Sequence, residues 1–310
     1  MFKRIFTRLL TAIMVSVTTL SLADQPRKIA LIAGKPSHGA GQHEYNAGCL
    51  LLKQCLDKLP QVEVSVYSGG WPTDTNVLND VSAVLIYSDG ASKNPAIQEN
   101  HAEVLDALAK KGVGIGFAHF ALEVPRDKGG ADLQKWIGGY YENLFSCNPF
   151  FEAKFDQFPD HPITRGVKPF SATDEWYFNM RFRPDTNGIT PILVTKPSDA
   201  VRKGPYSHPT GPYDHIVAAS GRDEVLLWVV ERPDGGRGLG FSGGHYHTNW
   251  ANPDFRKLVL NSILWLAKVE VPANGVESDV TADDLKKNLD LKGNKKAAAV
   301  LSTNVPAAKP

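Results

Sequence analysis

The sequence of 310 residues contains few cysteines and almost no net charge. The 34 Lys and Arg nearly cancel the 33 Asp and Glu, so no strong field directs the protein to nucleic acid or to an acidic membrane. Of the three cysteines, Cys49 and Cys55 fall on different faces of one predicted helix, and Cys147 has no evident partner. We therefore expect buried, unpaired cysteines and a fold that its core stabilises.

Three common catalytic motifs are also missing. The sequence has no G-x-S-x-G motif, which disfavours acyl-enzyme chemistry on a nucleophile elbow. It has no G-x-x-x-x-G-K-[ST] phosphate loop either. The glycines at 112, 114 and 116 lie inside a predicted strand rather than after one, so the dinucleotide-binding fingerprint is not met.

Residues 1–23 have the features of a signal peptide. Basic residues precede an uncharged stretch from 9 to 22, and Ser21, Leu22 and Ala23 resemble a cleavage site. The stretch is short for a membrane span, which needs about 20 residues. We expect an exported protein, periplasmic or extracellular, without an integral membrane domain in the mature chain. The alternative is an uncleaved N-terminal anchor.

Buried strands alternate with helices in the first third of the chain. Strands are expected at 28–33, 62–67, 83–87 and 112–118, and helices at 45–59 and 95–111. This alternation predicts a parallel sheet that is covered on both faces. Further strands are expected at 150–155, 189–195, 216–220, 225–231 and 238–242, before an amphipathic helix at 254–268.

We predict one α/β domain over residues 24–272, followed by a C-terminal extension over residues 273–310. Thr281 to Asp284 resembles a capping box before a short helix that ends at about Leu289. Residues 295–310 lack hydrophobic periodicity, which indicates a disordered tail.

Reactive side chains follow three of the predicted strands. They are His38, His43 and Glu44 after the first strand, His119 and Glu123 after the fourth, and His245 and His247 after the last. Open parallel sheets bind ligands beyond the carboxyl ends of their strands, so we expect a shared pocket. Imidazoles and carboxylates are ligands for zinc, manganese or iron. The same groups can instead transfer protons without a metal.

Carboxylates and aromatic rings also lie next to one another in the sequence. Asp174 and Glu175 directly precede Trp176 and Tyr177, a composition that suits a sugar site because aromatic faces pack on sugar C–H groups. The alternative is a turn acid beside two aromatic side chains of the core. For Tyr246 and Trp250, the same choice between sugar contact and packing stays open.

These features together resemble the ThuA-like (trehalose utilisation) family, whose fold is that of class I glutamine amidotransferases. The matching segments are His43-Glu44, Gly114 to Glu123, His161 to Gly166, Asp174-Glu175-x-Tyr177, and Gly244-His245 leading to 255–265. The resemblance covers about residues 28 to 280. It implies a flavodoxin-like three-layer sandwich with a mostly parallel central sheet and a role in carbohydrate metabolism.

The resemblance does not extend to glutamine hydrolysis. The amidotransferase relatives carry cysteine at the elbow, where this sequence has His119. Gly243-Gly244-His245 falls where the partner histidine of those enzymes would lie. We therefore expect a fold shared with these enzymes and a different reaction.

Our leading hypothesis is an exported enzyme that hydrolyses, eliminates or isomerises a small carbohydrate, either a glycoside or a keto-sugar. The expected groups are His119, Glu123, His245 and Glu44 for catalysis, Asp174, Glu175, Tyr177, Tyr246 and Trp250 for substrate binding, and His38, His43 and His247 for a metal. The alternatives are a non-catalytic sugar-binding protein and a degenerate amidotransferase-like subunit. The protein could form a homo-oligomer under any of these hypotheses.

Overall fold

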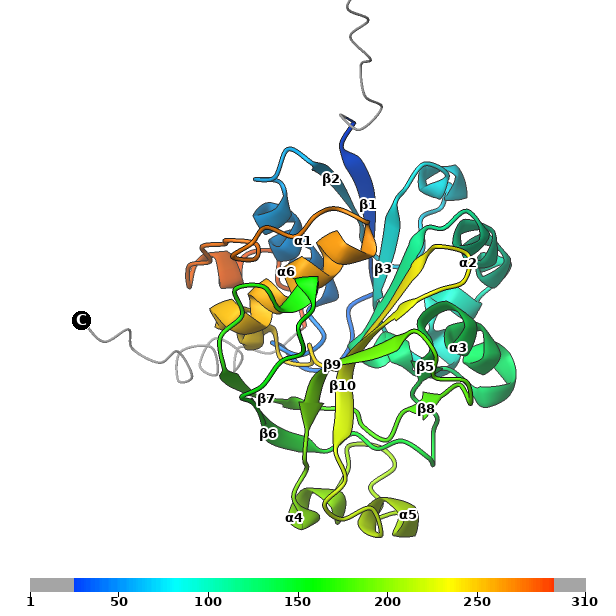
Figure 1. The fold of residues 1–310 in the computed structure, drawn as a ribbon, viewed down its shortest axis with the longest axis vertical. Coiled ribbons are helices and arrows are strands. Elements are labelled where there is room, and N and C mark those ends of the chain that lie inside the picture. Colours follow the sequence, from blue (N-terminus) through cyan, green and yellow to red (C-terminus); the bar gives the residue numbers. More distant parts are fainter. Residues whose placement is uncertain (1–24, 293–310) are drawn as a thin grey trace, which may run out of the picture.

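The computed structural model describes residues 25–292, so the predicted signal peptide and the predicted disordered tail lie outside the described residues. Its centre is a seven-stranded sheet in the order β2-β1-β3-β4-β11-β10-β9 (Figure 1). The strands are β1 (Arg27–Ala33), β2 (Val62–Tyr67), β3 (Ala83–Tyr87), β4 (Gly114–Ala118), β9 (Ile189–Thr195), β10 (Glu224–Glu231) and β11 (Arg237–Phe241).

Most neighbours in this sheet run parallel. The strands from β2 to β11 pair in parallel, and β10 is antiparallel to both β11 and β9. Strands β3 and β4 are buried at every position, as expected for a parallel sheet that is covered on both faces. The predicted α/β fold with a mostly parallel central sheet is therefore confirmed.

Helices cover the two faces of the sheet. Helices α1 (Tyr45–Leu56) and α6 (Pro253–Leu266) pack on one face, and α2 (His101–Lys110) and α3 (Ala131–Ile137) pack on the other (Figure 1). Gly114 allows α6 to lie close to the sheet, because a Cβ atom there would come within 2.1 Å of the Leu266 carbonyl oxygen.

Small elements complete the domain. Strands β6 (Phe150–Phe155) and β7 (Phe170–Glu175) pair with each other, as do β5 (Gly139–Tyr140) and β8 (Arg181–Phe182). Short helices α4 (Asp199–Arg202) and α5 (Asp214–Val217) lie between β9 and β10. Single 3-10 turns span Thr75–Leu78, Ala91–Lys93, Pro95–Ile97, His119–Leu122 (η5), Pro162–Thr164, His247–Ala251 (η8) and Asp284–Lys286 (η9), and Arg126–Gly130 forms a π turn.

Several sequence predictions differ from the structure in detail. The predicted strand at 216–220 is wrong, because this segment begins inside α5 and one helical turn already buries Ile216. Such a short apolar segment has too few residues for its period to distinguish strand from helix. The helix predicted from residue 95 begins only at His101, after a separate 3-10 turn. Strand β7 and helix α3 were not predicted.

Other predictions are confirmed. All three cysteines are buried and unpaired. Thr281 and Asp284 form the reciprocal bonds of a capping box, although the helix that follows is the single turn η9. Within residues 25–292, every helix is too short or too polar to cross a bilayer.

Candidate functional site

Four side chains converge at the carboxyl edge of the sheet. His43, His119, Glu175 and His245, here called the histidine cluster, are all buried and place their ligand atoms within 4.8 Å of one another. His119 directly follows β4 and His245 follows β11, while Glu175 ends β7 and His43 precedes α1. The structure thus confirms that histidines distant in sequence meet at one edge of the sheet.

The contacts inside the histidine cluster are short. Nε2 of His43 lies 3.0 Å from Nδ1 of His245 and 3.0 Å from Nε2 of His119. Glu175 Oε2 lies 2.8 Å from Nδ1 of His245 and 3.4 Å from Nε2 of His119. Three imidazole nitrogens and one carboxylate oxygen therefore face a common point.

The backbone fixes the tautomer of His119. Its Nδ1 lies 2.9 Å from the Ser242 carbonyl oxygen, which can only accept, so Nδ1 carries the proton. In the neutral ring, Nε2 is then a lone pair that faces the cluster. His119 has a φ of 54° directly after β4, a left-handed conformation that residues other than glycine adopt rarely and that surrounding contacts must maintain.

A carboxylate outside the cluster fixes the tautomer of His43. Asp89 Oδ1 accepts hydrogen bonds from Ser37 Oγ at 2.6 Å and from Tyr45 Oη at 2.9 Å. Tyr45 has one hydroxyl proton, which it donates to Asp89, so its oxygen accepts from Nδ1 of His43 at 2.6 Å. Nε2 of His43 consequently carries no proton, and its lone pair faces the cluster as the second one there.

Two lone pairs at this distance repel each other unless a cation lies between them. The Glu175 carboxylate favours such a cation, which can be a proton or a metal ion. Burial alone would lower the pKa of His119, but the bond to Glu175 raises it. Burial would likewise raise the pKa of Glu175. The rings of His119 and His245, which donate to this carboxylate when Nε2 and Nδ1 respectively carry a proton, hold the pKa below its usual range. The pKa of His43 is lowered to about 2, mainly by burial, so this ring stays neutral.

The chain segment that carries His245 is held by Asp174. This buried carboxylate accepts hydrogen bonds from the backbone N–H groups of Gly244 at 2.6 Å, His245 at 3.0 Å and Tyr246 at 3.3 Å. Both carboxylate oxygens are used inside the protein. Asp174 therefore stabilises the backbone around His245. Its contact with substrate stays a prediction.

Three other predicted site residues lie outside the histidine cluster. Glu44 is 1% exposed, and its two oxygens accept from the backbone N–H groups of Gly41 and Asp290, each at 2.8 Å. His247 is buried, and burial lowers its pKa to about 4. Trp250 is buried and packs edge-on against Phe255 at 5.3 Å. None of the three presents a side chain to the cleft described below.

Glu123 lies next to the cluster without joining it. The 3-10 turn η5 ends at Leu122, so His119 and Glu123, four positions apart, do not lie on one helix face. Burial and then the negative charge of Glu175 raise the pKa of Glu123 to about 7. Glu123 can therefore gain or lose a proton near neutral pH.

Aromatic side chains surround the entrance to the cluster. The exposed ring of His38 lies 3.6 Å from that of His43 and 6.1 Å from Phe120. Phe150 is 44% exposed and lies 5.0 Å from His245 and 5.7 Å from the half-buried Tyr246. The predicted Tyr177 is buried, with its ring 4.8 Å from His119 and its hydroxyl 3.5 Å from Glu175.

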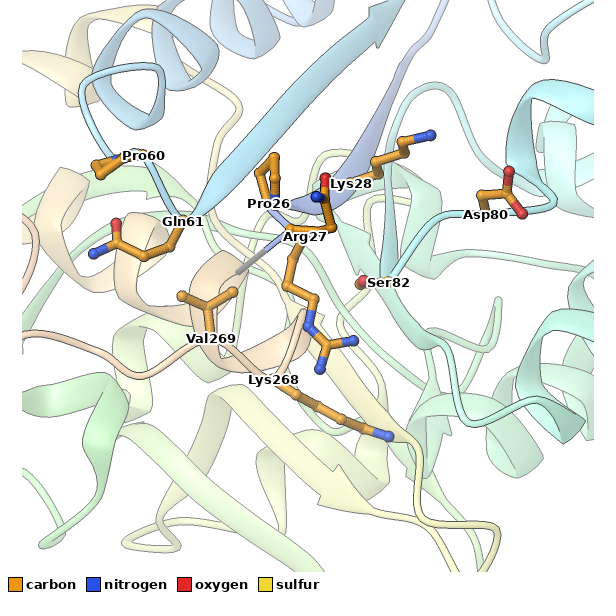
Figure 2. A pocket seen from close by; sticks show the side chains of 10 residues that line it. Pro26, Arg27, Lys28, Pro60, Gln61, Asp80, Ser82, Lys268 and Val269 are labelled. Carbon is orange, nitrogen blue, oxygen red and sulfur yellow. The ribbon is translucent and has the colours of Figure 1, made fainter. Parts of the chain in front are cut away.

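A cleft of about 370 Å³ opens beside the cluster, lined by Ser37, His38, Asp89, Gly90, Ala91, Ser92, Lys93 and Phe120. A larger cleft of about 690 Å³ lies at the opposite edge of the sheet, where β1 begins (Figure 2). Arg27 and Lys268 point into it (Figure 2). No residue of the histidine cluster lines either cleft. In the smaller one, however, His38, Asp89 and Phe120 lie directly beside His43, so the smaller cleft is the candidate substrate site.

The sequence prediction missed three residues of the site. Asp89 follows β3 by two positions, so the strand-end rule that selected the histidines would also have found it. Asn148 donates to Glu175 Oε1 at 3.1 Å, and Phe150 lies opposite Glu175 across the β6–β7 pair. No pattern in the sequence identifies these two, because both depend on how β6 and β7 pair.

Comparisons with known proteins agree with this fold. A ThuA-like protein from Parabacteroides merdae ATCC 43184 is 18% identical with a TM-score of 0.51, and the match covers 82% of this chain and 93% of that one. A ThuA-like protein from Bacteroides uniformis ATCC 8492 is 16% identical with a TM-score of 0.53, covering 80% and 94%. No curated protein matches the chain.

The two solved structures support the fold alone at these identities. The family model for ThuA, described as trehalose utilisation, matches residues 30–266, which is most of the sequence. The chain therefore belongs to the ThuA family, whose description suggests a carbohydrate-related role.

Proposed function

We propose that the protein is an exported enzyme that acts on a glycoside or keto-sugar at the histidine cluster, with a divalent metal as its cofactor. The proposal rests on the Nε2 atoms of His43 and His119, which lie 3.0 Å apart beside Glu175 and direct their lone pairs at each other. The carbohydrate substrate is inferred from the family description and from the aromatic entrance.

The residues present fit a metal ion. Nε2 of His43, Nε2 of His119, Nδ1 of His245 and a carboxylate oxygen of Glu175 would hold it, a donor set that zinc, iron and manganese accept. When bound, such an ion polarises a carbonyl or hydroxyl oxygen of the sugar.

Groups behind the ligands support this assignment. Metal-binding histidines usually donate their second ring N–H to a carbonyl or carboxylate, which fixes the ring. His119 does so to Ser242, and His43 is linked through Tyr45 to Asp89. Asn148 holds the remaining oxygen of Glu175. The Nε2 atom of His245 has no such partner among the described residues, so this support applies to two of the three rings and to Glu175.

Proton transfer is assigned to Glu123. Its pKa of about 7 allows the carboxyl group to donate or accept a proton at neutral pH. Isomerisation and elimination both require such a group.

The entrance suits a sugar. Phe150 and Tyr246 offer aromatic surface for the C–H groups of a pyranose ring. Ser37, Asp89 and Lys93 line the neighbouring cleft and can bond to hydroxyl groups. The cleft volume of about 370 Å³ lies within the range of small-molecule sites.

Two measurements test the proposal. Elemental analysis of protein purified without a histidine tag should find about one metal per chain. Metal well below one equivalent, unrestored by added zinc, manganese or iron, would reject the cofactor. Turnover is then measured on a panel of glycosides and keto-sugars with wild type and His119→Ala, and activity is expected only in the wild type.

A non-catalytic sugar-binding protein is the second candidate, favoured by the exposed ring of Phe150. Calorimetry with the same sugars separates the two. Binding that survives His119→Ala and His245→Ala, without turnover by any variant, would favour the binding protein.

A further inference from the structure

The described chain returns to the histidine cluster after the last helix of the domain. The turn η9 contacts α1 and η8, and Leu285 within it is only 6% exposed. The segment from η9 to Lys292 is therefore packed onto the domain, close to the two chain segments that carry His43 and His245.

Lys292 is buried there, which is unusual for lysine. Its side chain is 5% exposed, and Nζ lies 3.3 Å from Glu44 Oε1. The same ammonium group donates to the carbonyl oxygens of Gln42 and His43. Nζ also lies 3.5 Å from Asp290 Oδ2 in its own segment, so three of its four polar contacts are to residues 42–44.

The opposite side of this loop contacts the His245 segment. The His43 N–H donates to the His245 carbonyl oxygen at 2.9 Å, and the His247 N–H donates to the Gly41 carbonyl oxygen at 2.9 Å. His43 itself has a φ of 47°, a conformation that surrounding contacts must maintain. The loop is therefore held between Lys292 on one side and the His245 segment on the other.

We propose that Lys292 is a positioning residue of the site. With Glu44 as its buried counter-ion, it holds the backbone of residues 42 and 43, so that Nε2 of His43 stays 3.0 Å from both His119 and His245. Glu44 then acts on His43 through the backbone rather than on substrate. An effect of Lys292 on metal affinity rests on the proposed function. An effect of Lys292 on the order of the loop that carries His43 does not.

Lys292→Met tests this inference, because methionine keeps the apolar stem and removes the charge and the donors. Lys292→Arg restores both, and Lys286→Met is the matched control, since Lys286 is a solvent-exposed lysine of the same segment. Amide hydrogen exchange of the metal-free full-length chain is measured for residues 39–44. We expect Lys292→Met to accelerate it by at least about fivefold, the effect of losing one ordinary hydrogen bond, with Lys292→Arg close to wild type.

Zinc affinity is measured on the same proteins by calorimetry. Loss of a residue that orients a ligand weakens metal binding by roughly 10–100-fold, and we expect this loss in Lys292→Met alone. Unchanged exchange at residues 39–44 in Lys292→Met would overturn the inference, as would exchange that rises equally throughout the central sheet. If the wild type binds none of zinc, manganese and iron, the proposed cofactor fails, while the exchange result still decides the role of Lys292.

Discussion

Nε2 of His43 and Nε2 of His119 face each other at 3.0 Å, although 76 positions separate the two residues in sequence. Each ring donates from its Nδ1 atom, His119 to a carbonyl and His43 to a hydroxyl that a carboxylate fixes. Rotating either ring to relieve the repulsion would break one of these bonds. The fold therefore maintains a site for positive charge, and the predictions below follow from this arrangement.

The first prediction concerns stabilisation by metal. A ligand that binds only the folded state at 100 times its Kd stabilises it by about 2.7 kcal/mol, so zinc should raise the Tm of the wild type by several degrees. Glu175→Gln removes the carboxylate oxygen that faces the three imidazoles and should abolish the rise. Differential scanning calorimetry with and without zinc measures both. His161→Ala, a change outside the cluster, should respond as the wild type does.

Asp89→Asn should weaken zinc binding while the ligands themselves stay in place. The carboxylate accepts from Ser37 and Tyr45, which orients the Tyr45 hydroxyl toward Nδ1 of His43. An amide can reverse these bonds and favour the wrong tautomer of His43. We expect an affinity loss of roughly 10–100-fold in a calorimetric titration. An Asp89→Asn protein with wild-type affinity would contradict the tautomer assigned to His43.

The sequence identified the fold and the carboxyl edge of the sheet because both depend on local patterns. Buried strands that alternate with helices specify the parallel sheet, and the strand-end rule selects His43, His119 and His245. The sequence predicts that Glu175 binds substrate, because aromatic residues follow it. Its place beside the histidines, like that of Phe150, depends on the pairing of β6 with β7, which no short-range pattern encodes. Glu44 and Asp174 are buried acids whose partners are backbone N–H groups. Sequence alone cannot distinguish such acids from catalytic ones.

Glu123 should make stability depend on pH. Its pKa rises from an ordinary 4.5 to about 7 in the folded chain, through burial and then Glu175. Between these values the folded state binds more protons than the unfolded state, so the free energy of unfolding falls as pH rises. Above pH 7 the loss approaches about 3 kcal/mol, at about 1.4 kcal/mol per unit of pKa.

Glu123→Gln, which does not titrate, should remove this dependence. Urea unfolding in the presence of a chelator, from pH 4.5 to 8, compares the two proteins. The variant should gain stability over the wild type as pH rises through this window. A constant difference between the two curves would show that Glu123 ionises normally.

Asp174→Asn should disturb the site through the backbone. The carboxylate accepts from four N–H groups, those of Glu175, Gly244, His245 and Tyr246. An asparagine side chain has one accepting oxygen, and its amide group would face backbone N–H groups that can only donate. Hydrogen bonds to a charged group contribute about 1.5–3 kcal/mol each, so we expect a loss of roughly 2–4 kcal/mol in urea unfolding and weaker zinc binding.

The comparison with Asp234→Asn separates this effect from a general loss of charge. Asp234 forms its bonds in a turn with Arg232 and Gly236, at a distance from the histidine cluster, so its replacement can lower stability but should leave zinc affinity unchanged. Because Asp174 holds the N–H groups on both sides of His245, only its variant should lose stability and affinity together. If Asp174→Asn lost stability alone, the position of Nδ1 of His245 would not depend on these hydrogen bonds, and the structural role assigned to Asp174 in the site would be wrong.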